Sequence, residues 1–147
     1  MSSVKGVNYT NITADPIVKV DSEVLGGKIR VSYDSYEAAS LASGSDITIG
    51  RIPTNATIMD VVLKCDALGG SSTLTVGDSG DADRYLAAVG TWNAAGQVQS
   101  MLGGSTAANT AMTGLGYRTT AETDIVITTG GATTSGSIHC WVMSTVE

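Results

Sequence analysis

The sequence predicts an all-β protein, an antiparallel β-sandwich of the jelly-roll type with about eight strands. The first observation is composition: 18 Gly, no Phe and only 15% charged residues, with abundant Ser and Thr, which favours strands and turns. The second is an apolar/polar alternation of period two, and the third is a Gly-rich turn about every ten residues. A length of 147 residues suits one domain with a core of its own.

Residues 1–27 are predicted to form an extended N-terminal arm, ahead of a β-sandwich domain at residues 28–147. The arm shows no sustained period, Pro16 favours an extended chain before it, and Gly26-Gly27 supplies a hinge. It holds too many apolar residues for a free tail, so we expect it to lie against a partner; an ordinary edge strand of the same domain is the alternative. The predicted partner-binding residues of the arm are Val4, Val7, Tyr9, Ile12, Ile17, Val18 and Val20.

The first half of the sandwich domain alternates clearly. In residues 28–34, the side chains of Ile29, Val31 and Tyr33 share one face, which we expect to be buried. Residues 35–43 are ambiguous between a strand and a helical turn, and a strand at 45–53 ends at Pro53, which cannot donate to a ladder. The longest apolar run is 57–68, and its predicted core residues are Met59, Val61, Leu63 and Cys65.

The second half continues the pattern. Residues 73–77 are predicted to return from 57–68 as a hairpin partner, and 84–89 is a further strand. Residues 90–114 are predicted to form a long Gly- and Ala-rich loop, either irregular throughout or with one short helical turn near 106–112, and a loop of this length suggests contact with a partner. Residues 123–129 and 135–146 are predicted to form a closing hairpin.

Three side chains of this domain leave alternatives open. Trp92 lies in the long loop and is a candidate partner-binding residue, because an exposed ring can stack on a partner or a sugar; a buried ring would instead anchor the loop. Cys65 and Cys140 each lie in an apolar strand, which favours reduced, buried thiols over a disulfide between opposite sheets.

The stretch GDSGDADRYL at 77–86 has three interpretations. A nucleophilic Ser79 needs a base, and the chain's single histidine, His139, lies in the middle of a strand, so we expect no enzyme. A Ca²⁺ loop of Asp78, Asp81 and Asp83 is a weak metal candidate, because the spacing does not follow the EF-hand pattern. A structural turn is favoured, in which Asp78 and Ser79 bond downstream amides and Arg84 pairs with a nearby carboxylate.

Charge and hydropathy exclude several partners. The formal net charge is −6 and the eight Lys and Arg residues are scattered singly, whereas binding to a nucleic-acid backbone needs clustered bases. The start of the sequence has no apolar signal region, and no run approaches the roughly 20 apolar residues of a membrane span. We therefore expect no direct nucleic acid, no membrane and no cofactor, and a cytoplasmic site of synthesis.

A run of motifs resembles a known family. They are the alternating strand after Gly26-Gly27, the RIPTNATI turn at 51–58, the DALG corner at 66–69, the GDSGDADRY loop at 77–85 and the closing hairpin. Together they resemble small virion proteins of tailed bacteriophages that decorate or cement the head, over residues 28–146.

The resemblance implies a function. Such a protein binds the major capsid protein at capsomer junctions on the outer surface of the virion, as a homotrimer assembled in the bacterial cytoplasm. It implies no catalytic residue, and it allows the β-tulip fold of other head-decoration proteins as an alternative to the jelly roll. A phage tail, baseplate or receptor-binding β module is the alternative function, since it has the same all-β composition.

Overall fold

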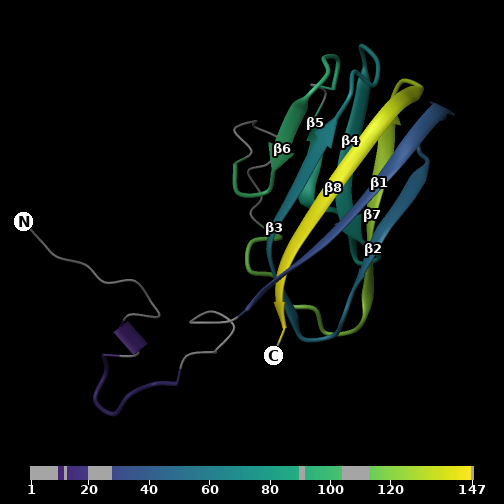
Figure 1. Cartoon of the computed structure of the whole chain (residues 1–147). Helices are drawn as coiled ribbons and strands as arrows, with labels where there is room; N and C mark the ends of the chain where they lie inside the picture. The colour runs from purple at the N-terminus through teal and green to yellow at the C-terminus, as the bar shows by residue number, and fades with distance from the viewer. Residues whose placement is uncertain (1–9, 12, 20–27, 90–91, 104–112, 147) are drawn as a thin grey trace, which may run out of the picture.

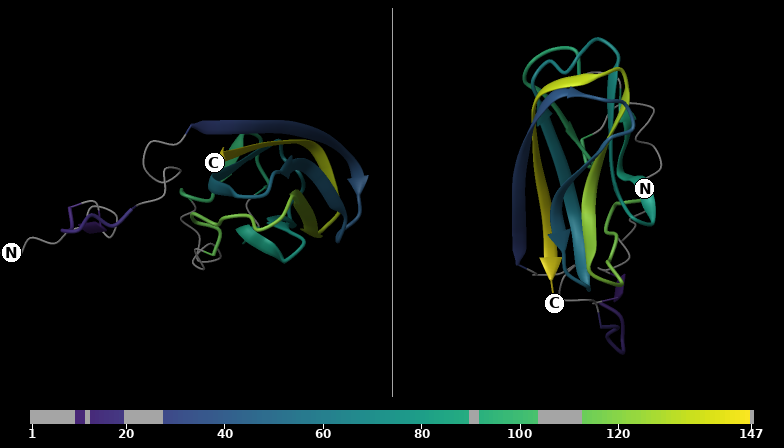
Figure 2. Two further views of the ribbon diagram at one scale, coloured as in Figure 1. Left: turned by 90° about the horizontal axis from the view of Figure 1, so that it is seen from below. Right: turned by 90° about the vertical axis from the view of Figure 1, so that its right-hand side faces the viewer.

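A computed structural model describes residues 10–11, 13–19, 28–89, 92–103 and 113–146 and confirms the predicted all-β sandwich (Figure 1). Eight antiparallel strands form two four-stranded sheets. Sheet A contains, in spatial order, β1 (Ile29–Leu41), β8 (Thr134–Val146), β3 (Ala56–Cys65) and β6 (Gln97–Ser100). Sheet B contains β2 (Asp46–Ile52), β7 (Thr123–Gly131), β4 (Ser72–Asp78) and β5 (Asp81–Val89). Figure 2 shows the two sheets as face-to-face layers.

The strands pair in nested fashion. β4 pairs with β5, β3 with β6, β2 with β7 and β1 with β8, so the chain is folded in half about the β4–β5 turn. Successive pairs alternate between the two sheets, and β8 and β7 complete them by pairing with β3 and β4. This order is that of the jelly roll rather than of the β-tulip alternative.

Two of the predicted hairpins are wrong. β3 and β4 belong to different sheets, as do β7 and β8, so the Gly-rich connections carry the chain across the sandwich instead of back along a neighbour. Gly69 and Gly131 adopt positive φ angles of 128° and 71° at these crossings, a conformation that glycine adopts without strain. Among the eight strands, β4 and β5 are the one consecutive pair that lies in the same sheet.

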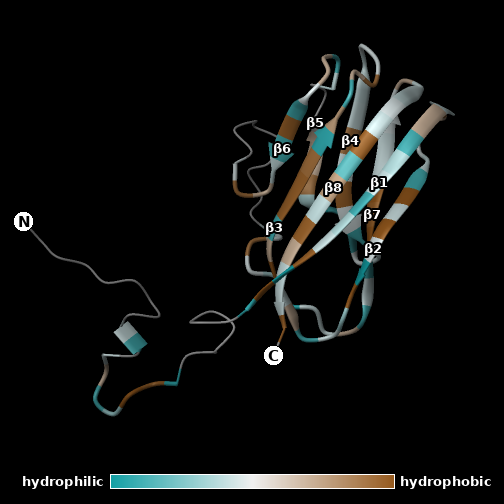
Figure 3. Ribbon diagram, in the orientation of Figure 1, coloured by the Kyte–Doolittle hydropathy of each residue, from teal (hydrophilic) through white to brown (hydrophobic). Residues whose placement is uncertain are grey.

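The core lies between the two sheets. Figure 3 shows hydrophobic and hydrophilic residues alternating along several of the strands. Most of the core's fully buried aliphatic residues come from β3, β4, β7 and β8, and each is expected to contribute about 1.5–3 kcal/mol through burial. They include Ile58, Val61, Leu63, Leu74, Val76, Ile125, Ile127 and Ile138.

A bulge in β3 changes its predicted core face. The register with β8 shifts between Ile58 and Asp60, so one extra residue reverses the alternation at that point. Ile58 is therefore buried, whereas Met59, predicted as core, is 38% exposed. Val61, Leu63 and Cys65 follow the bulge and are buried as predicted.

Strand β1 also reverses its prediction. Ile29, Val31 and Tyr33 do share one face, but that face points away from sheet B and is exposed. β1 is an edge strand whose ladder partner is β8, and it stays a strand through most of the ambiguous segment 35–43. From Ile29 to Glu37 its residues are exposed on both faces, except for the half-buried Ser32. This part of β1 therefore projects beyond the core.

The two thiols are free and buried as favoured, but they lie on β3 and β8, neighbours in sheet A, and not on opposite sheets. Burial raises the pKa of Cys65 and of Cys140 to about 12. Both are therefore protonated and unreactive at neutral pH.

The long loop and the arm are described in part. The loop contains a short strand, β6, that the sequence did not predict, while the predicted helical turn at 106–112 lies outside the described residues. Of the arm, residues 13–19 form a local loop that belongs to neither sheet, closed by a bond from the Val18 amide to the Asn11 carbonyl of 3.0 Å. No helix in the described part of the chain is long and apolar enough to cross a membrane.

Candidate docking surface

The β4–β5 turn is held by the carboxylate of Asp78. Its Oδ1 accepts from the amides of Gly80 and Asp81 at 2.9 and 3.2 Å. Its Oδ2 accepts from Arg84 Nε and the Tyr85 hydroxyl, both at 2.8 Å. The predicted turn is confirmed in the downstream amide bonds of Asp78 and in its Arg84 ion pair, while the bond predicted for Ser79 stays a prediction.

The environment of Asp78 fixes its charge. Burial alone would raise the pKa of this carboxyl, but hydrogen bonds from Tyr85, Gly80 and Arg84 outweigh burial and hold the pKa below its usual value. Burial, together with the bond to Asp78, raises the pKa of the Tyr85 hydroxyl, which stays a donor. The guanidinium of Arg84 also lies 4.0 Å above the ring centre of Tyr117, so this end of sheet B is braced by a buried polar network.

In the described residues, the turn shows the geometry of neither a catalytic nor a metal site. Asp78 directs both oxygens to protein donors, and no group of three His, Cys, Asp or Glu side chains in the described chain is arranged to hold a metal. Ser79 lies on the turn of sheet B, whereas His139 lies on sheet A and shares a 2.9 Å hydrogen bond with the Tyr33 hydroxyl. Ser79 therefore has no histidine base.

The indole ring of Trp92 is buried and is not available to a partner. Its side chain is 1% exposed and packs in the core cluster, so its assignment as a partner-binding residue is corrected. The structure supports the alternative interpretation, in which the indole anchors the long loop. The backbone agrees, because the Trp92 carbonyl accepts from the Leu68 amide at 2.7 Å.

Only some of the predicted partner-binding residues of the arm lie in the part of the chain that the structure describes. Val4, Val7, Tyr9, Ile12 and Val20 lie outside the described residues. Ile17 and Val18 are described and exposed, so both offer apolar surface to a partner. Their role in binding stays a prediction.

A more extensive apolar surface lies on the outer face of sheet A, away from sheet B. Three rings form its centre: Tyr33 of β1, and His139 and Trp141 of β8. The Tyr33 ring lies 5.0 Å from that of Trp141 and 6.1 Å from that of His139, centroid to centroid. Because directly opposed residues of an antiparallel ladder share a face, the registers of β1, β8 and β3 place the neighbouring side chains on this surface too.

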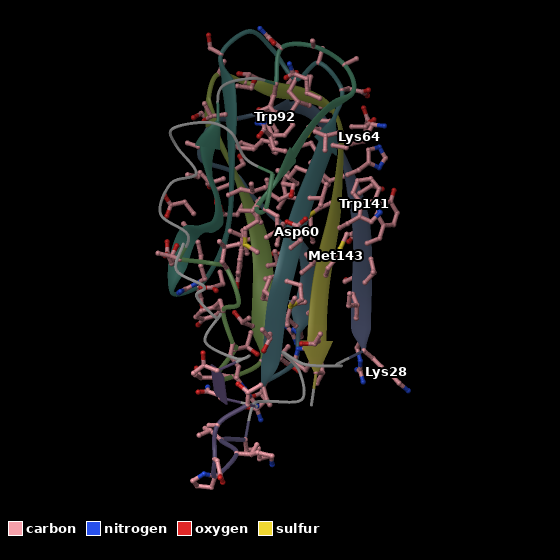
Figure 4. All side chains as sticks on the ribbon, turned by 90° about the vertical axis from the view of Figure 1, so that its left-hand side faces the viewer. Lys28, Asp60, Lys64, Trp92, Trp141 and Met143 are labelled. Carbon is pink, nitrogen blue, oxygen red and sulfur yellow. The ribbon has the colours of Figure 1, made fainter. Side chains whose placement is uncertain are left out.

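Aliphatic side chains continue this outer face on both sides of the rings. Val31 lies opposite Met143, and Val62 lies opposite Trp141. Figure 4 shows Trp141 and Met143 along this side of the molecule, between Lys64 near one end and Lys28 at the other. The apolar and aromatic residues of this outer face are Ile29, Val31, Tyr33, Val62, Val98, His139, Trp141 and Met143, and its polar residues are Ser35, Glu37, Asp60, Lys64, Ser100 and Ser137.

Sequence reasoning missed this surface as a site. Alternation showed that Ile29, Val31 and Tyr33 belong together, but it assigned them to the core. The missing signal was the partner strand: His139, Trp141 and Met143 also alternate, and two such faces on neighbouring strands form one surface.

The fold has similar counterparts among solved structures. One chain of the capsid asymmetric unit of cyanophage Pam1 matches with a TM-score of 0.65 and 29% identity, over 84% of this chain and 88% of that one. The chain resembles phage capsid proteins. Chains from the capsids of Ralstonia phage GP4 and Helicobacter pylori bacteriophage KHP30 match with TM-scores of 0.60 and 0.59, at 18% and 9% identity. They cover 82% and 80% of this chain and 86% and 87% of their own, and show a shared fold.

These neighbours confirm the resemblance to phage capsid-associated proteins, and they support a structural role in a phage virion. The matched chains are parts of phage capsids, and none of the three is described as an enzyme. No protein-family profile and no curated protein matches the sequence.

Proposed function

We propose that this protein decorates and cements the capsid of a tailed phage. It binds the major capsid protein at capsomer junctions on the outer surface, as a homotrimer. The observation that supports this most is the 29% identical match to a chain of the Pam1 capsid over most of both chains. The inert chemistry of the β4–β5 turn and the exposed apolar face of sheet A agree with a function based on contact area.

The arm supplies the attachment to the shell. Ile17 and Val18 are exposed in a loop outside both sheets, and five further apolar arm residues precede or follow them in the sequence. An apolar segment ahead of a stable domain can lie across a neighbouring capsomer while the domain covers the junction. Each contact is small, but several arms on one multimer bind together, which raises the effective affinity.

Purified protein and expanded phage heads test the proposal. Each head should bind a fixed number of copies of the protein. Binding should raise the melting temperature of the head, because a ligand that binds the intact shell stabilises it by mass action. Heads that gain neither bound protein nor thermal stability would contradict it.

A truncation separates the arm from the body. Deletion of residues 1–25 should leave the sandwich folded, since residues 10–11 and 13–19 belong to neither sheet, but weaken attachment to heads. A finer variant, Ile17→Ser with Val18→Ser, should weaken binding in the same direction, with Thr13→Ser as its matched control. Loss of folding on truncation would assign the arm to the core, and undiminished binding would exclude it from attachment.

A receptor-binding module remains the second candidate, because one observation favours it. The cluster of Tyr33, His139 and Trp141 offers ring surface of the kind that stacks on sugars. Binding of the protein to host cells or to glycan arrays, lost in Trp141→Ala, would support this function over capsid decoration.

A further inference from the structure

We propose that the outer face of sheet A, with β1 at its edge, is the surface through which copies of this chain associate with one another. The inference deepens the proposed function, because it names the surface that joins the copies. It rests on residues of the body alone, so it can fail while attachment to heads stands.

The first argument is the apolar area that the chain leaves uncovered. Ile29, Val31 and Tyr33, at alternate positions of β1, are 62%, 59% and 53% exposed. Contiguous apolar patches of this kind on a folded protein usually mark an interaction site. The backbone agrees, because β1 is a thirteen-residue edge strand with one ladder partner, β8, and long free edges tend to pair or to be covered.

The second argument is the size of the face. β1 and β8 have 13 residues each and β3 has 10, so at about 3.3 Å per residue and about 4.8 Å between strands they cover roughly 600 Å². Two such faces in contact bury roughly 1,200 Å² in all, which is the lower end of the range for specific protein interfaces. A second copy is therefore an occupant of adequate size.

The third argument is the distribution of charge. Five acids lie on strands of sheet B (Asp46, Asp78, Asp81, Asp83 and Asp124) and three on strands of sheet A (Asp34, Glu37 and Asp60), so copies that meet through sheet A keep the acids of sheet B apart. The outer face of sheet A carries both signs, with Glu37 on β1 and with Lys64 and Asp60 on β3. Lys64 and Glu37 form no ion pair with another described residue, and a second copy can supply the opposite charges.

The mixture of side chains favours a protein over a sugar. The aliphatic groups of Ile29, Val31 and Met143 extend the surface beyond the rings, where a hydrated polysaccharide would gain little. A protein surface that desolvates the rings and the aliphatic groups together gains from both.

The test is the mass of the full-length protein in solution. Sedimentation of the wild type should give a multiple of the 14.9 kDa chain mass at micromolar concentration. Val31→Lys adds a charge at an exposed position of the face and should weaken association at least tenfold, with an unchanged circular dichroism spectrum. The matched control, Thr48→Lys, adds the same charge to an exposed position of β2 on sheet B and should associate as the wild type does.

A second measurement needs no variant. Trp141 lies on the face and Trp92 is in the core, so dilution of the wild type should shift the tryptophan emission to longer wavelength as copies separate. A wild-type protein that sediments as a single chain would overturn the inference, and so would undiminished association of Val31→Lys or binding of a glycan by single chains through Trp141. Two chains in place of three would correct the homotrimer and leave the inference intact.

Discussion

Replacing Asp78 by alanine is expected to lower the free energy of unfolding by about 3 kcal/mol. Asp78 is buried and accepts from the Arg84 guanidinium and from the Tyr85 hydroxyl, whose residue is fully buried. Removing the carboxylate leaves both donors without their acceptor. Loss of one partner from a buried charge pair costs about 3–5 kcal/mol, and the lower value applies because the Arg84 side chain retains 16% exposure to water.

The assay is urea unfolding followed by circular dichroism, together with the melting temperature, which should fall by about 10 °C for a domain of this size. In a Tyr85→Phe background the same change should cost at least 1 kcal/mol less, because one orphaned donor is gone. The matched control is Asp83→Ala, which removes an exposed acid near the start of the adjoining strand β5 and should stay within about 0.5 kcal/mol of the wild type. An Asp78→Ala protein that is also within 0.5 kcal/mol would refute the bracing role of this carboxylate.

Three further predictions concern pH, thiols and turns. Folding lowers the pKa of Asp78, so the stability that its carboxylate contributes is present above the unfolded-state pKa of about 3.9 and is lost as pH falls through the folded-state pKa. Between about pH 6 and pH 2, the free energy of unfolding of Asp78→Asn should therefore fall less than that of the wild type. The native thiols of Cys65 and Cys140, with pKa values of about 12, should resist a thiol reagent at pH 8 until urea exposes them, and prompt labelling would contradict their burial. Gly131→Ala should lower the unfolding free energy by at least about 2 kcal/mol more than Gly44→Ala. Both glycines have positive φ, but a Cβ at position 131 collides with the Ser71 carbonyl, whereas a Cβ at position 44 meets open space. Equal unfolding midpoints of the two variants in urea would refute this.

The sequence predicted the features that are local. The turn at Asp78 and the Arg84 ion pair were recovered because all their partners lie within seven residues. Strands were recovered because alternation is itself a local property. Strand pairing was partly missed, since β3 pairs with β6 and β8, and β7 pairs with β2 and β4, and short Gly-rich connections resemble hairpin turns even where the chain changes sheet.

The candidate site was missed for a related reason. Period-two alternation groups Ile29, Val31 and Tyr33 but gives no direction, and apolar residues are assigned to the core by default. The side that faces inward is decided by the ladder with β8, where Cys140 and Val142 are buried and oppose Asp34 and Ser32. The bulge at Met59 is a comparable case, because one extra residue reverses the face without altering the composition of the strand.

The pairing of β1 with β8 has a consequence for when copies can meet. On a ribosome the chain emerges from β1 onward, and β8 is the last of the eight strands to be made. Until then Tyr33 has neither His139 nor Trp141 beside it, and the outer face of sheet A is incomplete. The proposed association of copies through this face therefore requires finished chains.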